Sequence, residues 1–545
     1  MRRRTTFALL GGAVASTVLT ACGDSSSGGT ALTVGLPNGP LAENNNPFTA
    51  TSSASSLGYR WLMYEPLAQV NLIAPDSDPT PWLAESWEWN DDYTSLTATA
   101  RDGVTWSDGT AFSVADIAYT FTLIKNNEAL NGNAIPFGDI TVTGRSVTVE
   151  FESPQYTNQD KLLHTFVVPE HLWEQIDDPT TDTVTAPVGT GPYLLKTWTA
   201  QAVTLEPNNN YWGGKPPVPQ IRYTSYNDNN AQTTALANGD CQWSYVFMPD
   251  HKKVFIDKDP DNHRLWFPSG LGIHCLWINH TRKPFDNVAL RQAMNLAIDR
   301  TAVHEQGEAG LYPLVASPTA IPTPVGDAFV SADYAGSSAT VDIDRAKQLL
   351  GDAGFTFDGD TLTAPDGTPV TMKLVDPSGW SDYLADLQII ADNLAQIGIK
   401  AEVETMTVDA WSTALAEGDF DASIHWTNTG VTPWDIFANI MDGAQLKDLG
   451  EPAAWNFGRF DSEEATDAIA QYARTDDEET RTKALEVLQR IMVEEVPAIP
   501  LVAGPIGANY SQKHWTGWPD EDNPYAMPQP TQPSASMIVM KLRSA

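Results

Sequence analysis

The clearest alternation of apolar and polar residues lies between residues 81 and 121. Leu96, Ala98 and Ala100 alternate with polar residues, which is the two-residue period of a half-buried strand. Turn-forming residues flank this segment, among them Asp102-Gly103. The pattern therefore predicts two short strands that are joined by tight turns.

A helix is predicted to follow these strands. Ser113 can cap its first turn, and Asp116 stands three residues later, where a carboxylate can accept the free backbone amides. Apolar residues then recur at the helical spacing i, i+3, i+4 and i+7, at Val114, Ile117, Ala118 and Phe121. This stretch is thus expected to form a hairpin followed by a helix.

The remaining chain shows both periods. Strand patterns occur at 31–34, at 140–152 as a pair around Gly144, and at 273–279, 370–375, 399–404, 421–425 and 496–501. Helical patterns occur at 284–298, 384–397, 408–416, 461–474 and 477–494. Strands and helices alternate after residue 369, which predicts βαβ units and a partly parallel sheet.

The string from 81 to 121 resembles the signature region of the family 5 extracytoplasmic solute-binding proteins, the oligopeptide, dipeptide, nickel and oligosaccharide receptors of bacterial ABC importers. Further strings resemble the same family, at 46–48, 64–67, 168–173, 187–193, 208–214 and 273–300. The resemblance implies an α/β fold of the two-lobed periplasmic-binding-protein type II (Venus flytrap), with an extra subdomain in the first lobe.

This resemblance also implies a division of the chain. Lobe I is expected to comprise 32–75, 190–270 and 503–545, with the extra subdomain at 76–189 and lobe II at 271–502. The hinge is expected in the strands near 270–279 and 496–502.

The N-terminus has the features of a bacterial lipoprotein signal. Three arginines precede an apolar run at 7–20 that is too short to span a bilayer. Leu19-Thr20-Ala21-Cys22 matches the lipobox, so 1–21 is expected to be removed and Cys22 lipidated, with 22–31 as a flexible tether. An ordinary cleaved signal with an incidental cysteine is the alternative. The expected location is the outer face of the cell membrane, reached by Sec or Tat export.

The net charge of the chain disfavours one class of partner, and its cysteines raise the question of a disulfide. The 32 basic and 69 acidic residues give a net charge of −37, which repels phosphate backbones and disfavours nucleic-acid binding. Cys241 and Cys275 can form a disulfide in an exported protein, but their sequence positions leave the pairing open.

No common catalytic or metal-binding motif is found in the sequence. Walker, His-Glu-x-x-His and Gly-x-Ser-x-Gly patterns are absent, and the nine histidines lack metal-like spacing. Gly189 and Gly191 do not continue as a dinucleotide motif, so a tight backbone turn is their expected role. Neither an enzymatic activity, a cofactor nor a metal is expected.

The chain contains 18 tryptophans, several of them on loops that follow predicted strands. Core packing is the alternative for any single one. Ligands of α/β sheets bind at the carboxyl ends of strands, however, and indoles there can stack on a sugar or an apolar side chain. The expected ligand contacts are Trp380, Trp426, Trp434, Trp455, Asn456, Asn279 and His425, with Trp61 from the first lobe.

One departure from the family bears on the ligand. Peptide receptors of the family typically carry Trp-x-x-Asp in lobe II, whose carboxylate pairs with the peptide ammonium. The matching string here is Trp426-Thr427-Asn428-Thr429, although Asp421 or Asp435 could substitute. The tail at 515–526 also resembles that of the oligosaccharide-binding members.

The expected function is therefore a monomeric receptor that binds a small extended ligand, favouring a β-linked oligosaccharide, and works with ABC permease and ATPase subunits. Three alternatives remain open at this point. They are an oligopeptide or dipeptide receptor of the same fold, a secreted glycoside hydrolase and a purely structural surface protein.

Overall fold

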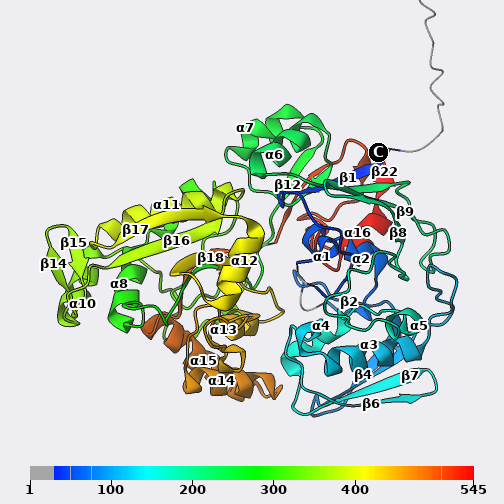
Figure 1. Cartoon of the computed structure of the whole chain (residues 1–545), viewed down its shortest axis with the longest axis horizontal. Coiled ribbons are helices and arrows are strands. Elements are labelled where there is room, and N and C mark those ends of the chain that lie inside the picture. The colour runs from blue at the N-terminus through cyan, green and yellow to red at the C-terminus, as the bar shows by residue number, and fades with distance from the viewer. Residues whose placement is uncertain (1–29, 50, 75–76, 505) are drawn as a thin grey trace, which may run out of the picture.

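The computed structural model describes residues 30–49, 51–74, 77–504 and 506–545, which form two lobes, each built around its own sheet (Figure 1). A four-stranded sheet forms a third unit beside the first lobe. The predicted signal peptide, Cys22 and most of the predicted tether lie outside the described residues.

Lobe I contains a seven-stranded mixed sheet. Its strands, in spatial order, are β12 (His263–Trp266), β20 (Ala508–Ser511), β11 (Trp243–Ser244), β1 (Leu32–Leu36), β10 (Ile221–Ser225), β9 (Ala202–Pro207) and β8 (Tyr193–Thr199). Its helices are α1 (Ser53–Leu57), α2 (Arg60–Met63), α6 (Asn229–Asn238), α7 (His251–Val254) and α16 (Ala535–Lys541). The central strand β1 runs parallel to both of its neighbours, and its apolar residues lie in the lobe's core.

The third unit confirms the predicted hairpins and helix. Its antiparallel sheet has the order β4 (Ala84–Trp89), β5 (Ser95–Ala100), β7 (Ser146–Phe151) and β6 (Phe137–Thr143). Its helices are α3 (Val114–Asn126), α4 (Gln159–Leu163) and α5 (Glu170–Trp173). The Ser113 side chain caps α3, and Asp116 accepts a hydrogen bond from the Ser113 backbone amide, so the capping box is complete.

Lobe II contains a five-stranded sheet, and the predicted βαβ pattern is confirmed. The strand order is β17 (Lys400–Met406), β16 (Thr371–Pro377), β18 (Ala422–Trp426), β13 (Ile273–Ile278) and β19 (Ala498–Ala503). β16 pairs in parallel with both β17 and β18. The helix between β16 and β17 is α11 (Ser381–Ala395), and the helix between β17 and β18 is α12 (Val408–Glu417).

Helices cover both faces of the lobe II sheet, which explains why every residue of β13 is buried. Leu276 and Ile278 pack in the core with α11 and with α8 (Val288–Ala297) and α10 (Ile343–Asp352). Cys275 and Trp277 point to the other face and its second core. Helices α12, α13 (Trp434–Met441), α14 (Glu463–Ala473) and α15 (Glu478–Glu494) supply that second core.

Short elements complete the fold. Three two-stranded sheets pair β2 (Ala68–Gln69) with β3 (Thr80–Pro81), β14 (Thr356–Asp358) with β15 (Thr361–Thr363), and β21 (Trp515–Thr516) with β22 (Arg543–Ser544). One short helix is α9 (Arg300–Ala302). The single turns are η1 (Glu128–Leu130), η2 (Tyr156–Asn158), η3 (Ile256–Lys258), η4 (Val303–Gly307), η5 (Asp327–Phe329) and η6 (Gly443–Gln445).

The chain crosses between the lobes after β12 and again after β19, which β20 of lobe I follows. The predicted hinge strands do not make these crossings, because β13 and β19 pair with each other inside lobe II. The predicted range 270–279 overlaps the first crossing only at 270–272. The hinge prediction is thus wrong in position by a few residues on each side.

The lobes touch near these crossings. The Tyr312 hydroxyl of lobe II donates a hydrogen bond of 2.7 Å to the Tyr245 hydroxyl of lobe I. The Asn229 amide, at the start of α6, donates to Ser381 at 3.1 Å and to Asp382 at 3.2 Å.

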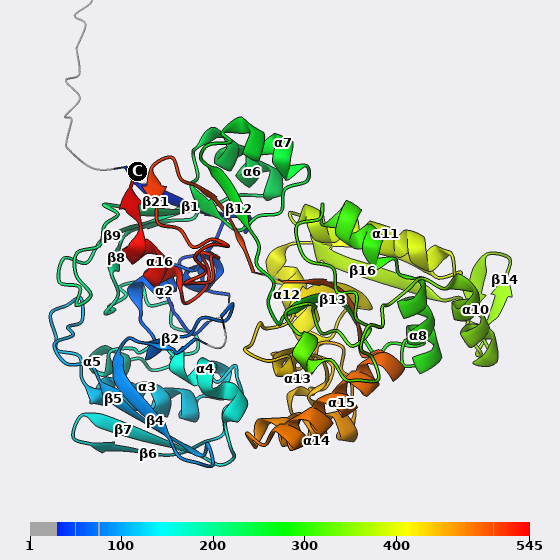
Figure 2. The same ribbon diagram turned by 180° about the vertical axis from the view of Figure 1, so that it is seen from behind.

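A second contact joins the extra subdomain to lobe II, where the turn η2, which precedes α4, approaches α14 (Figure 2). The Lys161 ammonium is 2.6 Å from the Asp435 carboxylate. The Arg481 guanidinium lies 4.5 Å from the ring centre of Tyr156 and 4.4 Å from that of Tyr472. The structure therefore holds the two lobes together from both sides.

The two described cysteines do not form a disulfide. Cys241 is buried in lobe I, and Cys275 is buried in β13 of lobe II. Burial raises the pKa of the Cys241 thiol to about 12 and also raises the pKa of the Cys275 thiol, so both thiols stay protonated at neutral pH.

Candidate ligand-binding site

The candidate site is a cluster of aromatic rings at the carboxyl ends of β16 and β18. Trp380 immediately precedes α11, and Trp426 is the last residue of β18; both are half-buried. The buried Trp411 of α12 lies between them, its ring centre 5.0 Å from that of Trp380 and 6.1 Å from that of Trp426. Ligands of α/β sheets bind at this end of the strands.

The imidazole of His425 extends this cluster. Its ring stacks 4.0 Å from that of Trp426 and 5.3 Å from that of Trp411, with interplanar angles of 22° and 19°. Burial lowers the pKa of His425 to about 3, so the ring is neutral at pH 7. Its Nδ1 lies 2.7 Å from the Trp426 carbonyl oxygen, which makes Nδ1 the protonated nitrogen.

Trp455 borders the same cluster from the loop after α13. Its half-buried ring lies 5.9 Å from that of His425 and 5.8 Å from that of Phe457. The structure thus brings together four of the eight predicted contact residues. We call this set, completed by one further ring, the aromatic platform: Trp380, Trp411, His425, Trp426 and Trp455.

Trp434 lies elsewhere. Its ring is buried, and its Nε1 donates a hydrogen bond of 3.0 Å to the Ile469 carbonyl. The Lys161 ammonium of the extra subdomain lies 4.7 Å from the centre of the Trp434 ring, a cation–π contact. One face of this indole is therefore covered by the contact between the lobes.

Three other predicted contact residues are buried inside the lobes, and their polar groups already form hydrogen bonds within the protein. The fully buried Asn279 amide donates to two backbone carbonyls, at 2.9 and 3.0 Å. The fully buried Asn456 amide exchanges hydrogen bonds with the backbone of Phe460. Trp61 is 6% exposed, and its Nε1 donates to the Thr531 carbonyl. We therefore omit these three from the proposed contact set.

The carboxylates that could have replaced the missing Trp-x-x-Asp aspartate are engaged by the protein. Asp421 accepts a hydrogen bond of 2.9 Å from the Lys373 amide, and Asp435 is paired with Lys161. At the matching position, Thr429 packs so closely on Gly272 that a Cβ on the glycine would lie 2.4 Å from the Thr429 Oγ1.

Trp411 was missed by sequence reasoning. The segment 408–416 was expected only to form a helix, and an indole on a helical face is more often a core residue. It is indeed buried, and its Nε1 donates a hydrogen bond of 2.9 Å to the Ser423 hydroxyl. Only the strand order β17-β16-β18 places α12 beside the two other indoles.

A group of buried titratable side chains beside the platform was also missed. His274 and Glu308 are 2% and 0% exposed, and the His274 Nδ1 lies 3.7 Å from the Glu308 Oε1. Asp386 is 1% exposed, and Asp382 is half-buried in the first turn of α11. We call these four residues the acid cluster. Only Asp382 and Asp386 are close along the chain, four residues apart in α11, whereas Glu308 and His274 lie 74 or more residues before them, so the sequence does not signal the group.

Burial and mutual repulsion perturb this cluster. Burial, followed by the charge of Glu308, raises the pKa of Asp382 to about 7. The same two causes raise the pKa of Asp386. A Cβ on Gly307 would lie 1.7 Å from the Asp386 Oδ1, so only glycine allows this carboxylate to approach.

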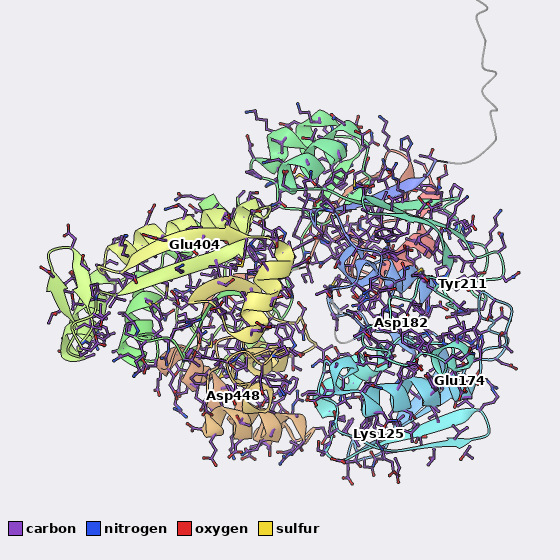
Figure 3. The ribbon with its side chains drawn as sticks, in the orientation of Figure 1. Lys125, Glu174, Asp182, Tyr211, Glu404 and Asp448 are labelled. Carbon is purple, nitrogen blue, oxygen red and sulfur yellow. The ribbon has the colours of Figure 1, made fainter. Side chains whose placement is uncertain are left out.

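Several family motifs meet instead at Glu65, far from the platform. Its buried carboxylate accepts hydrogen bonds from the Trp82 indole at 2.6 Å, from the Tyr211 hydroxyl at 2.7 Å and from the Trp212 indole at 2.9 Å. Tyr211, labelled in Figure 3, belongs to lobe I, whereas Trp82 leads into the extra subdomain. These motif residues hold two parts of the chain together.

The glycines of the 187–193 motif have a related role. A Cβ on Gly189 would lie 1.9 Å from the Met63 carbonyl oxygen, and one on Gly191 would lie 2.3 Å from the Leu62 carbonyl oxygen. Two stretches of backbone thus touch directly in lobe I. The role of these glycines is structural, as predicted, but it is the close approach of two backbone segments and not the predicted tight turn.

Among the described residues, no group of three or more His, Cys, Asp or Glu side chains is arranged to hold a metal ion. The same part of the chain also contains no helix that is both long and apolar enough to cross a membrane.

Comparisons with known proteins match this fold and sequence. Residues 78–446 match the model of the bacterial extracellular solute-binding proteins, family 5. The chain is 26% identical over 460 residues to the glutathione-binding protein GsiB of Shigella flexneri, covering 80% of this chain and 82% of that protein. It is 26% identical over 458 residues to GsiB of Escherichia coli K12, with the same coverage.

Solved structures agree. The periplasmic oligopeptide-binding protein of Thermotoga maritima superposes with a TM-score of 0.82 and 24% identity over 94% of this chain and 99% of the other. The mannohexaose-bound form of that protein gives 0.82, 25% identity and coverage of 94% and 98%. The Bacillus subtilis AppA complex with a nonapeptide superposes with a TM-score of 0.79 and 20% identity, covering 95% of this chain and 99% of the other. The two-lobed type II fold is thereby confirmed, and the chain belongs to family 5 of the bacterial extracellular solute-binding proteins.

Proposed function

We propose that this protein captures an extended ligand between its two lobes and presents it to the permease and ATPase subunits of an ABC importer. The aromatic platform at the carboxyl ends of β16 and β18 carries this proposal. A ligand that contacts both lobes favours the closed form by its differential affinity. Release then requires only that the permease favour the open form.

The ligand class that best fits this platform is a β-linked oligosaccharide. Half-buried indoles present flat apolar faces to the C–H face of a sugar ring. Covering a fully exposed indole removes about 150–250 Å² from water, worth about 4–6 kcal/mol before the costs of binding. These indoles are already half-buried, so a ligand gains only part of that amount from each. The Thermotoga maritima relative with bound mannohexaose supports a sugar ligand.

A short peptide is the second candidate for the same site. The names of the glutathione-binding relatives favour it. Thr429 argues against a peptide that is bound as in the family's peptide receptors. It occupies the position of their ammonium-binding aspartate, and its hydroxyl is neutral.

The proposal includes the location and the division of the chain. Residues 1–21 are removed, Cys22 carries a lipid, and the monomeric receptor stands on the outer face of the cell membrane, tethered by 22–31. Lobe I, the extra subdomain and lobe II follow the boundaries given above. The composition of the N-terminus and the three larger sheets, of seven, four and five strands, support this division.

Calorimetry of the purified protein against β-linked gluco- and xylo-oligosaccharides, mannohexaose and short peptides tests the function. We expect saturable binding of an oligosaccharide, with the ligand recovered intact by chromatography. Binding of peptides alone would establish the second candidate. Cleaved sugars would identify a glycoside hydrolase and overturn the proposal, and the absence of any binding would point to a structural protein.

A further inference from the structure

The acid cluster lies where the two lobes meet, next to the aromatic platform. The Asp382 carboxylate accepts the hydrogen bond from Asn229 of lobe I. A chain of rings joins the cluster to the platform: the Tyr383 ring centre is 5.5 Å from that of Trp380 and 5.3 Å from that of His274. The acid cluster therefore adjoins the end of the platform that Trp380 forms.

Buried polar atoms of the cluster lack partners within the described part of the chain. Both carboxylate oxygens of Glu308, both of Asp386 and both ring nitrogens of His274 have no hydrogen-bond partner there. His274 points its Nδ1 at Glu308 across 3.7 Å. Unsatisfied buried groups are rare in native proteins. A proton shared between the Asp386 and Glu308 carboxyl groups satisfies part of this set, and the remaining atoms, above all the two His274 nitrogens, indicate a missing polar partner.

The chemistry of the cluster specifies that partner. Three carboxyl groups and one imidazole gather there, and among the described residues no lysine or arginine forms an ion pair with these carboxyl groups. Buried acids of like charge repel one another, and a cation would relieve that repulsion. Within the described residues, these side chains are not arranged to hold a metal ion.

Asp382 gives this cluster an opening. Its side chain is half-buried, whereas those of Glu308 and Asp386 are buried. Two half-buried aromatic residues lie near it: Trp380, two residues earlier in the chain, and Tyr245, across the contact between the lobes. The faces of such rings attract cations, most strongly where water is excluded.

We infer that the ligand carries a basic nitrogen, which the Asp382 carboxylate receives at the mouth of the acid cluster. This inference rests on the proposed function and specifies its ligand. Because the platform suits sugar rings, the nitrogen is assigned to an amino sugar. Asp382 is the accessible member of the cluster, and the buried Glu308 and Asp386 lie behind it.

Matched ligands test this inference by calorimetry at pH 7.5. Oligomers of β-linked glucosamine carry free amines, whereas oligomers of N-acetylglucosamine of the same length and linkage are neutral. A short peptide with a free amino terminus and its N-acetylated form provide the second pair. We expect the glucosamine oligomer to bind at least tenfold more tightly than its acetylated counterpart.

Two variants localise the effect. Asp382→Asn keeps the shape of the side chain and should weaken glucosamine-oligomer binding at least tenfold while changing acetylated-oligomer binding less than twofold. Asp392→Asn removes an exposed carboxylate from the same helix and should change neither affinity. Should Asp382→Asn lower the melting temperature, Glu308→Gln gives the same comparison.

The outcomes separate this inference from the proposed function. Equal binding of free and acetylated sugars, or an Asp382→Asn effect on both, overturns the inference and leaves the sugar receptor intact. Binding of the free-amine peptide but of neither sugar, lost in Asp382→Asn, supports the basic nitrogen and overturns the sugar assignment. Binding of no member of either pair overturns the inference, and the proposed function then depends on the neutral oligosaccharides of the first panel.

Discussion

The Tyr211 hydroxyl donates a hydrogen bond of 2.7 Å to the Glu65 carboxylate, although 146 residues separate the two along the chain. Both residues belong to strings that resemble the family, and neither lies near the platform. The strings that identify the family therefore build lobe I and fasten the extra subdomain to it. The proposed ligand contacts lie elsewhere, in lobe II.

Stability should depend on the protonation of Glu65. Burial raises its pKa from 4.5 to about 7, so between these values the folded state binds more protons than the unfolded state. The free energy of unfolding should then fall as pH rises from about 4.5 to about 7, and level off above that. Glu65→Gln should reduce this slope, as measured by urea unfolding at pH 5, 6, 7 and 8.

The exposed Glu152 provides the matched control, since Glu152→Gln makes the same chemical change on the surface. Its slope should equal that of the natural chain. An unchanged slope in Glu65→Gln would show that this carboxylate does not titrate as its burial implies.

Much of the fold could be predicted because hydrophobic periodicity is a local property. The alternation at 95–100 and the cap at Ser113 identify β5 and α3, and the alternating periods after residue 369 identify the parallel strands of lobe II. The exact crossings between the lobes could not be predicted, since pairing between β13 and β19 is not visible in either strand alone.

The candidate site was only partly predictable for a related reason. A tryptophan near a strand can remain partly exposed, as Trp426 does at the end of β18, or take part in a contact between the lobes, as Trp434 does under Lys161. Asparagines on loops likewise turn inward to satisfy backbone carbonyls, as Asn279 does. Which role applies depends on the residues that surround the side chain in the folded protein, and these are distant from it in the sequence.

Trp426→Ala should weaken ligand binding at least tenfold, which corresponds to about 1.4 kcal/mol or more. The indole is half-buried and is expected to cover one face of the ligand, so its loss removes stacking without emptying the core. Calorimetry measures the affinity, and circular dichroism checks the fold. Trp87→Ala, a half-buried indole of the extra subdomain, should leave binding unchanged. Equal affinity in Trp426→Ala would remove this residue from the site.

Lys161→Ala should shift the protein toward an open form. Asp435 is 5% exposed, and losing its partner at 2.6 Å leaves a buried charge unpaired, at a cost of about 3–5 kcal/mol while the lobes stay together. Small-angle X-ray scattering should show a larger radius of gyration without ligand, and calorimetry a weaker affinity.

Lys373→Ala is the control for this contact, because its partner Glu404 is exposed and such surface pairs contribute little. It should change neither scattering nor affinity. Identical scattering of Lys161→Ala and the natural chain would mean that this ion pair does not hold the lobes together.

Cys22→Ser should release the protein from the membrane. The serine hydroxyl cannot take the place of the thiol that the lipobox presents for lipidation. Fractionation of expressing cells should find the variant in the soluble exported fraction and the natural chain with membranes. Continued membrane association of the variant would contradict a lipid anchor at Cys22.

A crystal structure of the protein with a bound β-linked oligosaccharide tests the central claim most directly. The account predicts an intact sugar between the lobes, with the faces of its rings on Trp426 and Trp380. A sugar bound on an outer surface, or an interior site in which those two indoles make no contact with it, would contradict the account.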